Sequence, residues 1–169
     1  MKLPTASARV QADKKAIWNE FRSAESADFY TVGYSGRSID EFVAMLRSVG
    51  VATLCDVRQN PVSMYKPDFS KQNLARYLKA SDIDYLPLPH LGVPREVRAQ
   101  AAEVQNREII WDWYDRNVAE RHITANLTVF LNMADHPIAL MCVEHDPTSC
   151  HRHRLSIRLE RFGLNSFDL

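Results

Sequence analysis

A buried strand, an amphipathic helix and a second buried strand follow one another in the first half of the sequence. Residues 29–32 are aromatic or β-branched, and Gly33 ends the run, which is typical of a buried strand. Ser38 and Glu41 have the spacing of a capping box that opens a helix, and Gly50 is placed to end that helix. The second strand is expected over residues 51–57. This order predicts two parallel strands joined by a right-handed crossover.

Strands and helices continue to alternate along the rest of the chain. A helix that begins near Ser70 precedes a third strand at 83–88. Helical stripes of apolar residues follow over 94–122 and again over 123–134. The nearly continuous apolar segment 137–143 predicts a central parallel strand. The sequence therefore predicts an α/β fold, a Rossmann-like three-layer domain whose mainly parallel sheet is flanked by helices.

The predicted domain covers residues 28–169 and is preceded by an accessory N-terminal segment, residues 1–27. Residues 9–24 of this segment can form a short helix. Its apolar side would consist of Ile17, Trp18 and Phe21. We expect this helix to lie against the domain.

The composition argues against several classes of protein. Twenty-one basic and 21 acidic residues give a formal net charge of zero, which disfavours nucleic-acid binding through a broad basic face. Three cysteines do not suggest a disulfide scaffold, and no apolar run is long enough to cross a bilayer. We expect a cytoplasmic protein without a membrane partner. The oligomeric state and any cofactor stay open.

Polar or reactive side chains follow three of the predicted strands. They are Tyr34 and Ser35, then Asp56, Arg58 and Ser63, and finally Cys142 and Glu144. Ligands of open parallel sheets bind beyond the carboxyl ends of the strands. The three segments therefore predict one shared site at this edge of the sheet.

The segment after the last long strand adds a second cysteine and two basic residues. A final helix is expected to begin near Pro147, which would place Cys150 in its first turn, where the helix dipole favours a thiolate. His151 and Arg152 would flank the helix face that packs on the sheet. Free amides at the same helix start could hold an anion.

These motifs resemble domain-of-unknown-function family 488. The matching residues are Gly33-Tyr34-Ser35, Asp56-Val57-Arg58 with Pro61 and Ser63, Leu91-Gly92, Cys142-Val143-Glu144, and Cys150-His151-Arg152. The resemblance implies an α/β fold and a shared site, but it supplies no activity. Tyr34 departs from the histidine that is common at its position, so a general base there is not expected.

Our leading hypothesis is a site for an anionic, phosphate-bearing small molecule or nucleotide, with Cys-dependent catalysis as one form of it. The candidate catalytic residues are Cys142, Glu144, Cys150 and Asp56. The candidate ligand-binding residues are Tyr34, Ser35, Arg58, Ser63, His151 and Arg152. Each also has a structural interpretation, such as core packing for the cysteines and turn capping for Asp56.

Two alternatives remain open. A nucleic-acid-associated protein would use the aromatic cluster 111–114 together with Arg107, Arg116 and Arg121. It would also use the arginine-rich end of the chain, with Arg152, Arg154, Arg158 and Arg161. A metal-binding protein would draw on Cys142, His145, Cys150, His151 and His153. Their spacing matches none of the usual structural zinc patterns, so we assign no metal ligand from the sequence.

Overall fold

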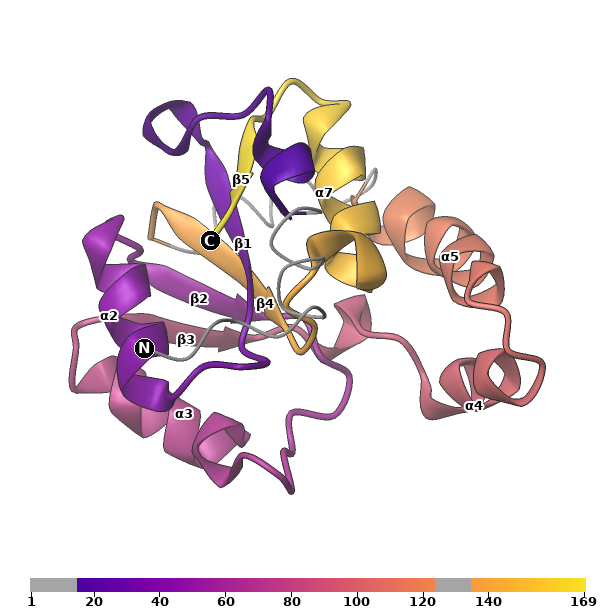
Figure 1. The fold of residues 1–169 in the computed structure, drawn as a ribbon, viewed down its shortest axis with the longest axis horizontal. Coiled ribbons are helices and arrows are strands. Elements are labelled where there is room, and N and C mark those ends of the chain that lie inside the picture. Colours follow the sequence, from indigo (N-terminus) through magenta and orange to yellow (C-terminus); the bar gives the residue numbers. More distant parts are fainter. Residues whose placement is uncertain (1–14, 124–134) are drawn as a thin grey trace, which may run out of the picture.

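Five parallel strands form one sheet in the computed structural model, which describes residues 15–123 and 135–169 (Figure 1). The strands are β1 (Phe29–Gly33), β2 (Thr53–Asp56), β3 (Asp84–Pro87), β4 (Ile138–Cys142) and β5 (Ser166–Asp168). Their order across the sheet is β3-β2-β4-β1-β5, so β4 pairs with both β1 and β2. The predicted parallel α/β sheet is confirmed, with β4 at its centre.

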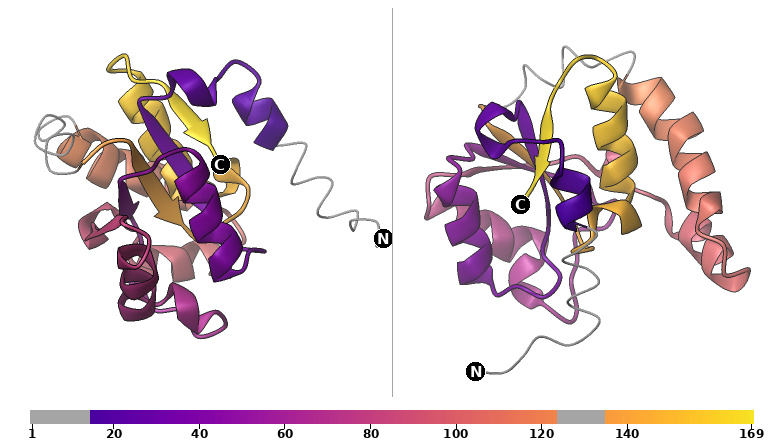
Figure 2. Two further views of the ribbon diagram at one scale, coloured as in Figure 1. Left: turned by 90° about the vertical axis from the view of Figure 1, so that its left-hand side faces the viewer. Right: turned by 45° about the horizontal axis from the view of Figure 1, so that its top comes forward.

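Helices cover both faces of this sheet (Figures 1 and 2). Apart from the short helical segment at residues 15–19, the α-helices of the described residues are α2 (Ile39–Ser48), α3 (Lys71–Lys79), α4 (Arg95–Glu103), α5 (Glu108–Tyr114) and α7 (His151–Glu160). A π-helical stretch, η4 (Asp115–Ile123), continues α5, and short 3-10 turns occur at η1 (Ala24–Ser26), η2 (Pro67–Phe69), η3 (Pro89–Leu91) and η5 (Pro147–Ser149). Helices α2 and α3 lie on one face, and α5 and α7 lie on the other. This is the expected three-layer arrangement.

Strand β4 divides the hydrophobic core into two layers. Ala139 and Met141 belong to the cluster under α2 and α3, whereas Leu140 and Cys142 belong to the cluster under α5 and α7. This division follows from the alternation of side chains along a strand. Because all five residues of β4 are buried, the strand is apolar on both faces.

The helix between β1 and β2 begins and ends as its sequence predicts. The side chain of Ser38 accepts a hydrogen bond from the Glu41 amide at 3.2 Å, and the Glu41 carboxylate accepts one from the Ser38 amide at 2.8 Å. Both halves of the capping box are therefore formed. Gly50 follows the helix with a φ of 71°, the left-handed conformation that glycine adopts at low cost.

The accessory segment differs from its prediction. Residues 15–19 are helical, but Ile17 and Phe21 are 68% and 89% exposed, so the predicted apolar side is not buried. Trp18 alone of the three packs on the domain, with its ring centroid 4.5 Å from that of His153. The first residues of the predicted helix, 9–14, and the apolar stripe at 123–134, apart from its first residue, lie outside the described residues.

The end of the chain also departs from its prediction. The final helix begins at His151 instead of near Pro147, because residues 147–149 form the separate turn η5. Cys150 is consequently the N-cap of α7, with extended backbone angles, and does not lie in its first turn. Strand β5 was not predicted; at three residues it is too short to produce a periodic pattern.

Candidate functional site

A cavity of about 180 Å³ lies beyond the carboxyl ends of β1, β2 and β4. Six of the residues singled out from the sequence line it: Tyr34, Arg58, Cys142, Glu144, Cys150 and His151. Tyr34 directly follows β1, Arg58 lies just beyond β2, and Cys142 is the last residue of β4. The cavity is therefore at the edge of the sheet where parallel α/β folds bind their ligands.

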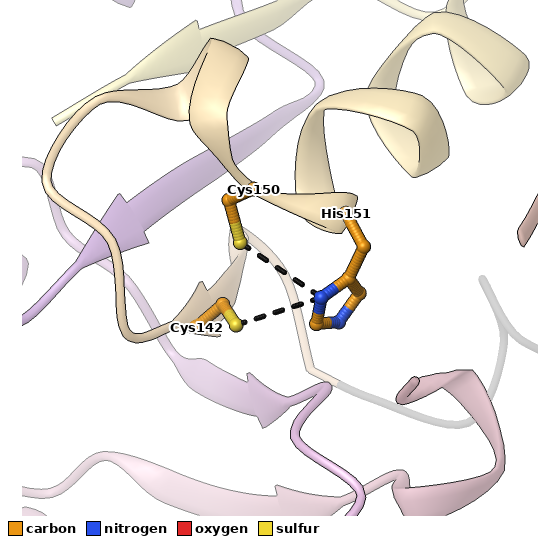
Figure 3. A group of neighbouring side chains, drawn as sticks. All are labelled: Cys142, Cys150 and His151. Atoms are coloured by element: carbon orange, nitrogen blue, oxygen red, sulfur yellow. Dashed lines mark hydrogen bonds between the residues drawn. The ribbon is translucent and has the colours of Figure 1, made fainter. Parts of the chain in front are cut away.

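Two cysteines and a histidine meet in the wall of the cavity (Figure 3). The Nδ1 atom of His151 lies 3.8 Å from Sγ of Cys142 and 3.9 Å from Sγ of Cys150. All three side chains are buried, and one ligand atom from each lies within 4.8 Å of the others. We call these three residues the Cys/His cluster.

The orientation of the His151 ring is fixed from its far side. Its Nε2 atom lies 3.0 Å from the carbonyl oxygen of Val57. A carbonyl only accepts hydrogen bonds, so Nε2 carries the proton and donates it. In the neutral ring, Nδ1 is then the unprotonated nitrogen, with its lone pair on the side of the two sulfur atoms. The backbone that follows β2 thereby selects the tautomer that can take a proton or a metal ion.

The two thiols influence each other's ionisation in opposite directions. The hydrogen bond that Cys142 donates to Cys150, together with burial, raises the pKa of Cys142 well above that of an ordinary thiol. Burial also opposes ionisation of Cys150, but the hydrogen bond from Cys142 and the interaction with His151 outweigh it, so the pKa of Cys150 is well below the usual range. The metal-free pair therefore favours one thiolate, on Cys150.

Arg58 forms the basic part of the inner cavity wall and is held by Asp56. Its Nε donates to Oδ1 of Asp56 at 2.8 Å, and one terminal nitrogen donates to Oδ2 at 2.6 Å. Burial works against the charge of Arg58, yet the Asp56 carboxylate more than compensates and raises the guanidinium pKa. Another terminal nitrogen donates to the Tyr34 hydroxyl at 3.3 Å. Asp56 itself lies behind Arg58 and does not line the cavity.

The loop between Cys142 and Cys150 is fixed by contacts along its length. Asp146 caps η5, accepting hydrogen bonds from the amide of Thr148 at 2.9 Å and the hydroxyl of Ser149 at 2.9 Å. A Cβ on Gly33 would lie 1.7 Å from the Glu144 carbonyl oxygen, so the loop packs against β1 at a distance that only glycine permits. The two cysteines are thus presented by a defined backbone.

Arg152 supports this loop from behind. Its guanidinium donates to the carbonyl oxygens of Glu144 and His145 and forms an ion pair with Asp168 at 3.1 Å. The side chain is fully buried and is not among the residues that line the cavity. The expectation that Arg152 points towards the strand ends as a ligand-binding group does not match this geometry, because β5 supplies a buried partner on the other side.

The cavity mouth contains charged residues from α4 and α5. Arg98 lies on α4, and Arg107 immediately precedes α5. Arg107 lies 3.9 Å from the Glu144 carboxylate, and both side chains are about half exposed, at 57% and 46%. Burial, followed by the nearby Cys150, raises the pKa of Glu144, although Arg107 opposes this shift. Trp111 adds an aromatic surface beside them.

The remaining predicted site residues lie around the cavity without lining it. Ser35 donates its amide to the Val143 carbonyl at 2.9 Å, and Ser63 donates its amide to the Ser70 hydroxyl at 3.0 Å. Sequence reasoning did not include Arg98 in the site. Nothing in the pattern of α4 separates Arg98 from its other exposed charges, and its role at the mouth depends on how α4 packs. Arg107 and Trp111 were noticed only for the nucleic-acid alternative.

A parallel α/β domain that carries a Cys/His cluster and a basic cavity at its carboxyl edge defines the class of this protein. A family described as Domain of unknown function DUF488 matches residues 38–159, and the chain belongs to this family. The matched range includes the segments around Arg58 and the cluster, but it begins after Ser35. No curated protein and no solved structure matched the chain. Within the described ranges, no helix has the length and apolar character needed to span a bilayer.

Proposed function

We propose that this protein is an enzyme that binds a small anionic molecule in the cavity and acts on it through the Cys/His cluster. One observation carries the proposal: the cluster lines the same small cavity as the cations Arg58, Arg98 and Arg107. A volume of about 180 Å³ suits a phosphate-bearing group or a small organic acid, and is below the roughly 300 Å³ at which drug-sized sites begin. A nucleotide would place its phosphate inside and its base at the mouth, beside Trp111.

In the metal-free protein, Cys150 would be the nucleophile. It caps α7, whose dipole favours a thiolate, and His151 Nδ1 lies 3.9 Å from its sulfur atom. Sγ of Cys150 would form a bond to the electrophilic atom of the substrate while the bond to the leaving group breaks. Nδ1 of His151 would take the proton of the Cys150 thiol as Sγ attacks, and would pass it to the leaving group as that group departs with the electron pair of the broken bond. The arginines would stabilise the substrate's negative charge.

The preference of Cys150 for a charged alkylating agent tests this proposal. Iodoacetamide reacts faster than iodoacetate with a free thiol, because the thiolate repels the carboxylate. In the metal-free folded protein the arginines should make iodoacetate the faster reagent at Cys150. Mass spectrometry measures the alkylation rate at each cysteine separately. Arg98→Ala and Arg107→Ala should each lower the iodoacetate-to-iodoacetamide rate ratio by about 1.4-fold to fivefold, the range for exposed charge pairs.

Arg95→Ala is the matched control, because Arg95 is exposed on α4, as Arg98 is, but does not line the cavity. This variant should keep the wild-type ratio. A ratio equal to that of a free thiol, unchanged in Arg98→Ala, would show that the cavity does not attract anions and would refute the proposal.

We rank the nucleic-acid alternative second. Arg107 and Trp111 line the cavity, but Arg116 and Arg121 do not, and the net charge is zero. A single nucleotide therefore fits this site better than a strand. The three cysteines are free although two of them are neighbours in the cluster, and we therefore propose a reducing, cytoplasmic setting.

A further inference from the structure

We propose that the Cys/His cluster binds a zinc ion through Sγ of Cys142, Sγ of Cys150 and Nδ1 of His151, with a fourth coordination position directed into the cavity. The inference goes beyond the proposed function by naming a cofactor, and it rests on that function only in assigning the fourth position to the substrate. Two thiolates and one imidazole are a ligand set that soft-ligand metals prefer, zinc among them.

The distances in the cluster are close to those of a formed site. Tetrahedral zinc, with Zn–S near 2.3 Å and Zn–N near 2.0 Å, separates sulfur from nitrogen by about 3.6 Å. The two sulfur-to-nitrogen distances here are 3.8 and 3.9 Å. Both sulfur-to-nitrogen distances are therefore within a few tenths of an ångström of the separation around a bound ion, and the three ligand atoms all lie within 4.8 Å of one another. Side-chain adjustments alone can close this difference.

The environment of the ligands supports the same inference. A histidine that binds a metal normally donates its other N–H to a carbonyl or carboxylate, and His151 Nε2 donates to the Val57 carbonyl at 3.0 Å. The Asp146 cap and the Arg152 contacts hold the loop that carries both cysteines. The site is thus organised before any ion enters, which lowers the entropic cost of binding.

Three protein ligands characterise catalytic rather than structural zinc sites, which have four. Among the described residues the cluster has three members, and His145 and His153 are not part of it. All three members line the cavity, so a bound zinc ion would face an anion held by the arginines. Zinc would then act as a Lewis acid or would activate a water molecule, and both thiolates would be ligands instead of nucleophiles.

Metal content and cobalt substitution test the site directly. The full chain, purified without a histidine tag, should contain one zinc ion per chain by elemental analysis. After chelation, added Co²⁺ should produce sulfur-to-cobalt charge-transfer absorption and the intense visible bands of tetrahedral cobalt. Cys142→Ser, Cys150→Ser and His151→Asn should each weaken binding of zinc by more than the roughly 10–100-fold that loss of an outer-shell partner costs. Circular dichroism verifies that the variants are folded.

Cys55→Ala is the matched control, because Cys55 is a buried cysteine in β2 outside the cluster, and this variant should bind one ion as the wild type does. Less than about a tenth of an equivalent of zinc, with no cobalt spectrum, would overturn the inference. Zinc that remains bound in Cys142→Ser and Cys150→Ser would overturn the ligand set. Another metal held by the same three residues would overturn the choice of zinc. The anion test uses metal-free protein, so failure of one proposal leaves the other measurable.

Discussion

Asp56 uses both carboxylate oxygens to hold the inner wall of the cavity. Oδ1 accepts from the amide and Nε of Arg58, whereas Oδ2 accepts from the Arg58 terminal nitrogen and from the Tyr85 hydroxyl at 2.6 Å. Burial and the bond to this carboxylate raise the pKa of Tyr85, which keeps the hydroxyl protonated as a donor. One buried acid therefore positions a cation that follows β2 and a phenol on β3.

We predict that Asp56→Asn destabilises the protein by about 3–5 kcal/mol, because the substitution leaves the Arg58 charge buried without its counter-ion. The Asp56 and Arg58 side chains are only 1% and 4% exposed. Urea unfolding of the wild type and of Asp56→Asn at neutral pH measures the difference in their free energies of unfolding. Asp112→Asn is the control: Asp112 and Arg116 are 67% and 74% exposed, so its loss should cost only roughly 0–1 kcal/mol. Equal stabilities of the two variants would contradict the prediction.

At this scale the sequence indicated the edge of the sheet where the cavity lies, but it did not indicate how individual side chains are oriented there. Reactive residues at three strand ends were enough to indicate the edge of the sheet, because parallel topology brings those ends together. The orientation of Arg152 was not predictable, since its partner Asp168 lies in a strand too short to recognise. The cluster itself depends on the turn η5, which the sequence pattern did not separate from the helix that follows.

Helix α2 shows how local signals determine an element. The capping box at Ser38 and the left-handed Gly50 bracket the helix, and both were evident from residue types alone. In contrast, α4, α5 and η4 were read as one helical stretch. Gln105, which has a φ of 50°, lies in the break between α4 and α5, and a positive φ at glutamine has no clear sequence signal.

Ser38→Ala should destabilise the protein by about 1 kcal/mol, because the Glu41 amide loses its acceptor at the start of α2. Ser48→Ala provides the comparison at the other end of the same helix. Ser48 is exposed, and its hydroxyl only donates to the Met45 carbonyl within the helix. Urea midpoints for the two variants should therefore differ, with Ser38→Ala the less stable. Indistinguishable midpoints would mean that the capping box contributes nothing measurable.

Over the whole molecule, the described N-terminal segment is joined to α7 and β5. Arg22 forms two hydrogen bonds of 2.9 Å with the Glu160 carboxylate, and Asn19 donates to the Asp168 carbonyl at 2.8 Å. The sequence predicted a segment that lies against the domain, and of its three apolar residues Trp18 packs there while Ile17 and Phe21 are exposed. Polar contacts between distant parts of a chain leave no periodic signal, so they become evident only in three dimensions.

The contact between Arg22 and Glu160 should make the stability of the protein depend on pH. Burial raises the pKa of Glu160, but the hydrogen bonds from Arg22 and Ser166 outweigh it, so the folded pKa is below the usual value. A lowered folded pKa stabilises the protein above the pKa of the unfolded chain, and this contribution is lost as the pH falls through the folded pKa. Glu160→Gln should therefore lose less stability than the wild type between pH 6 and about pH 3.

Thermal unfolding across this pH range measures the effect, and Glu103→Gln, at an exposed position at the end of α4, is the control. The control should follow the wild-type curve. If Glu160→Gln does so as well, the ion pair with Arg22 does not contribute to the acid sensitivity of the fold.

The strand order has a consequence for the way the chain is made. Strands β1 and β2 do not pair with each other, and both find their neighbour in β4, more than 80 residues after β2. While a ribosome is still translating the segment before Ile138, β1 and β2 are already made, but the strand that lies between them in the sheet is not. β1 and β2 can join one sheet only after β4 has left the ribosomal exit tunnel. Because β4 ends in Cys142, and Cys150 and His151 follow within ten residues, the central strand and the Cys/His cluster become available for folding almost together, before α7 and β5 complete the domain.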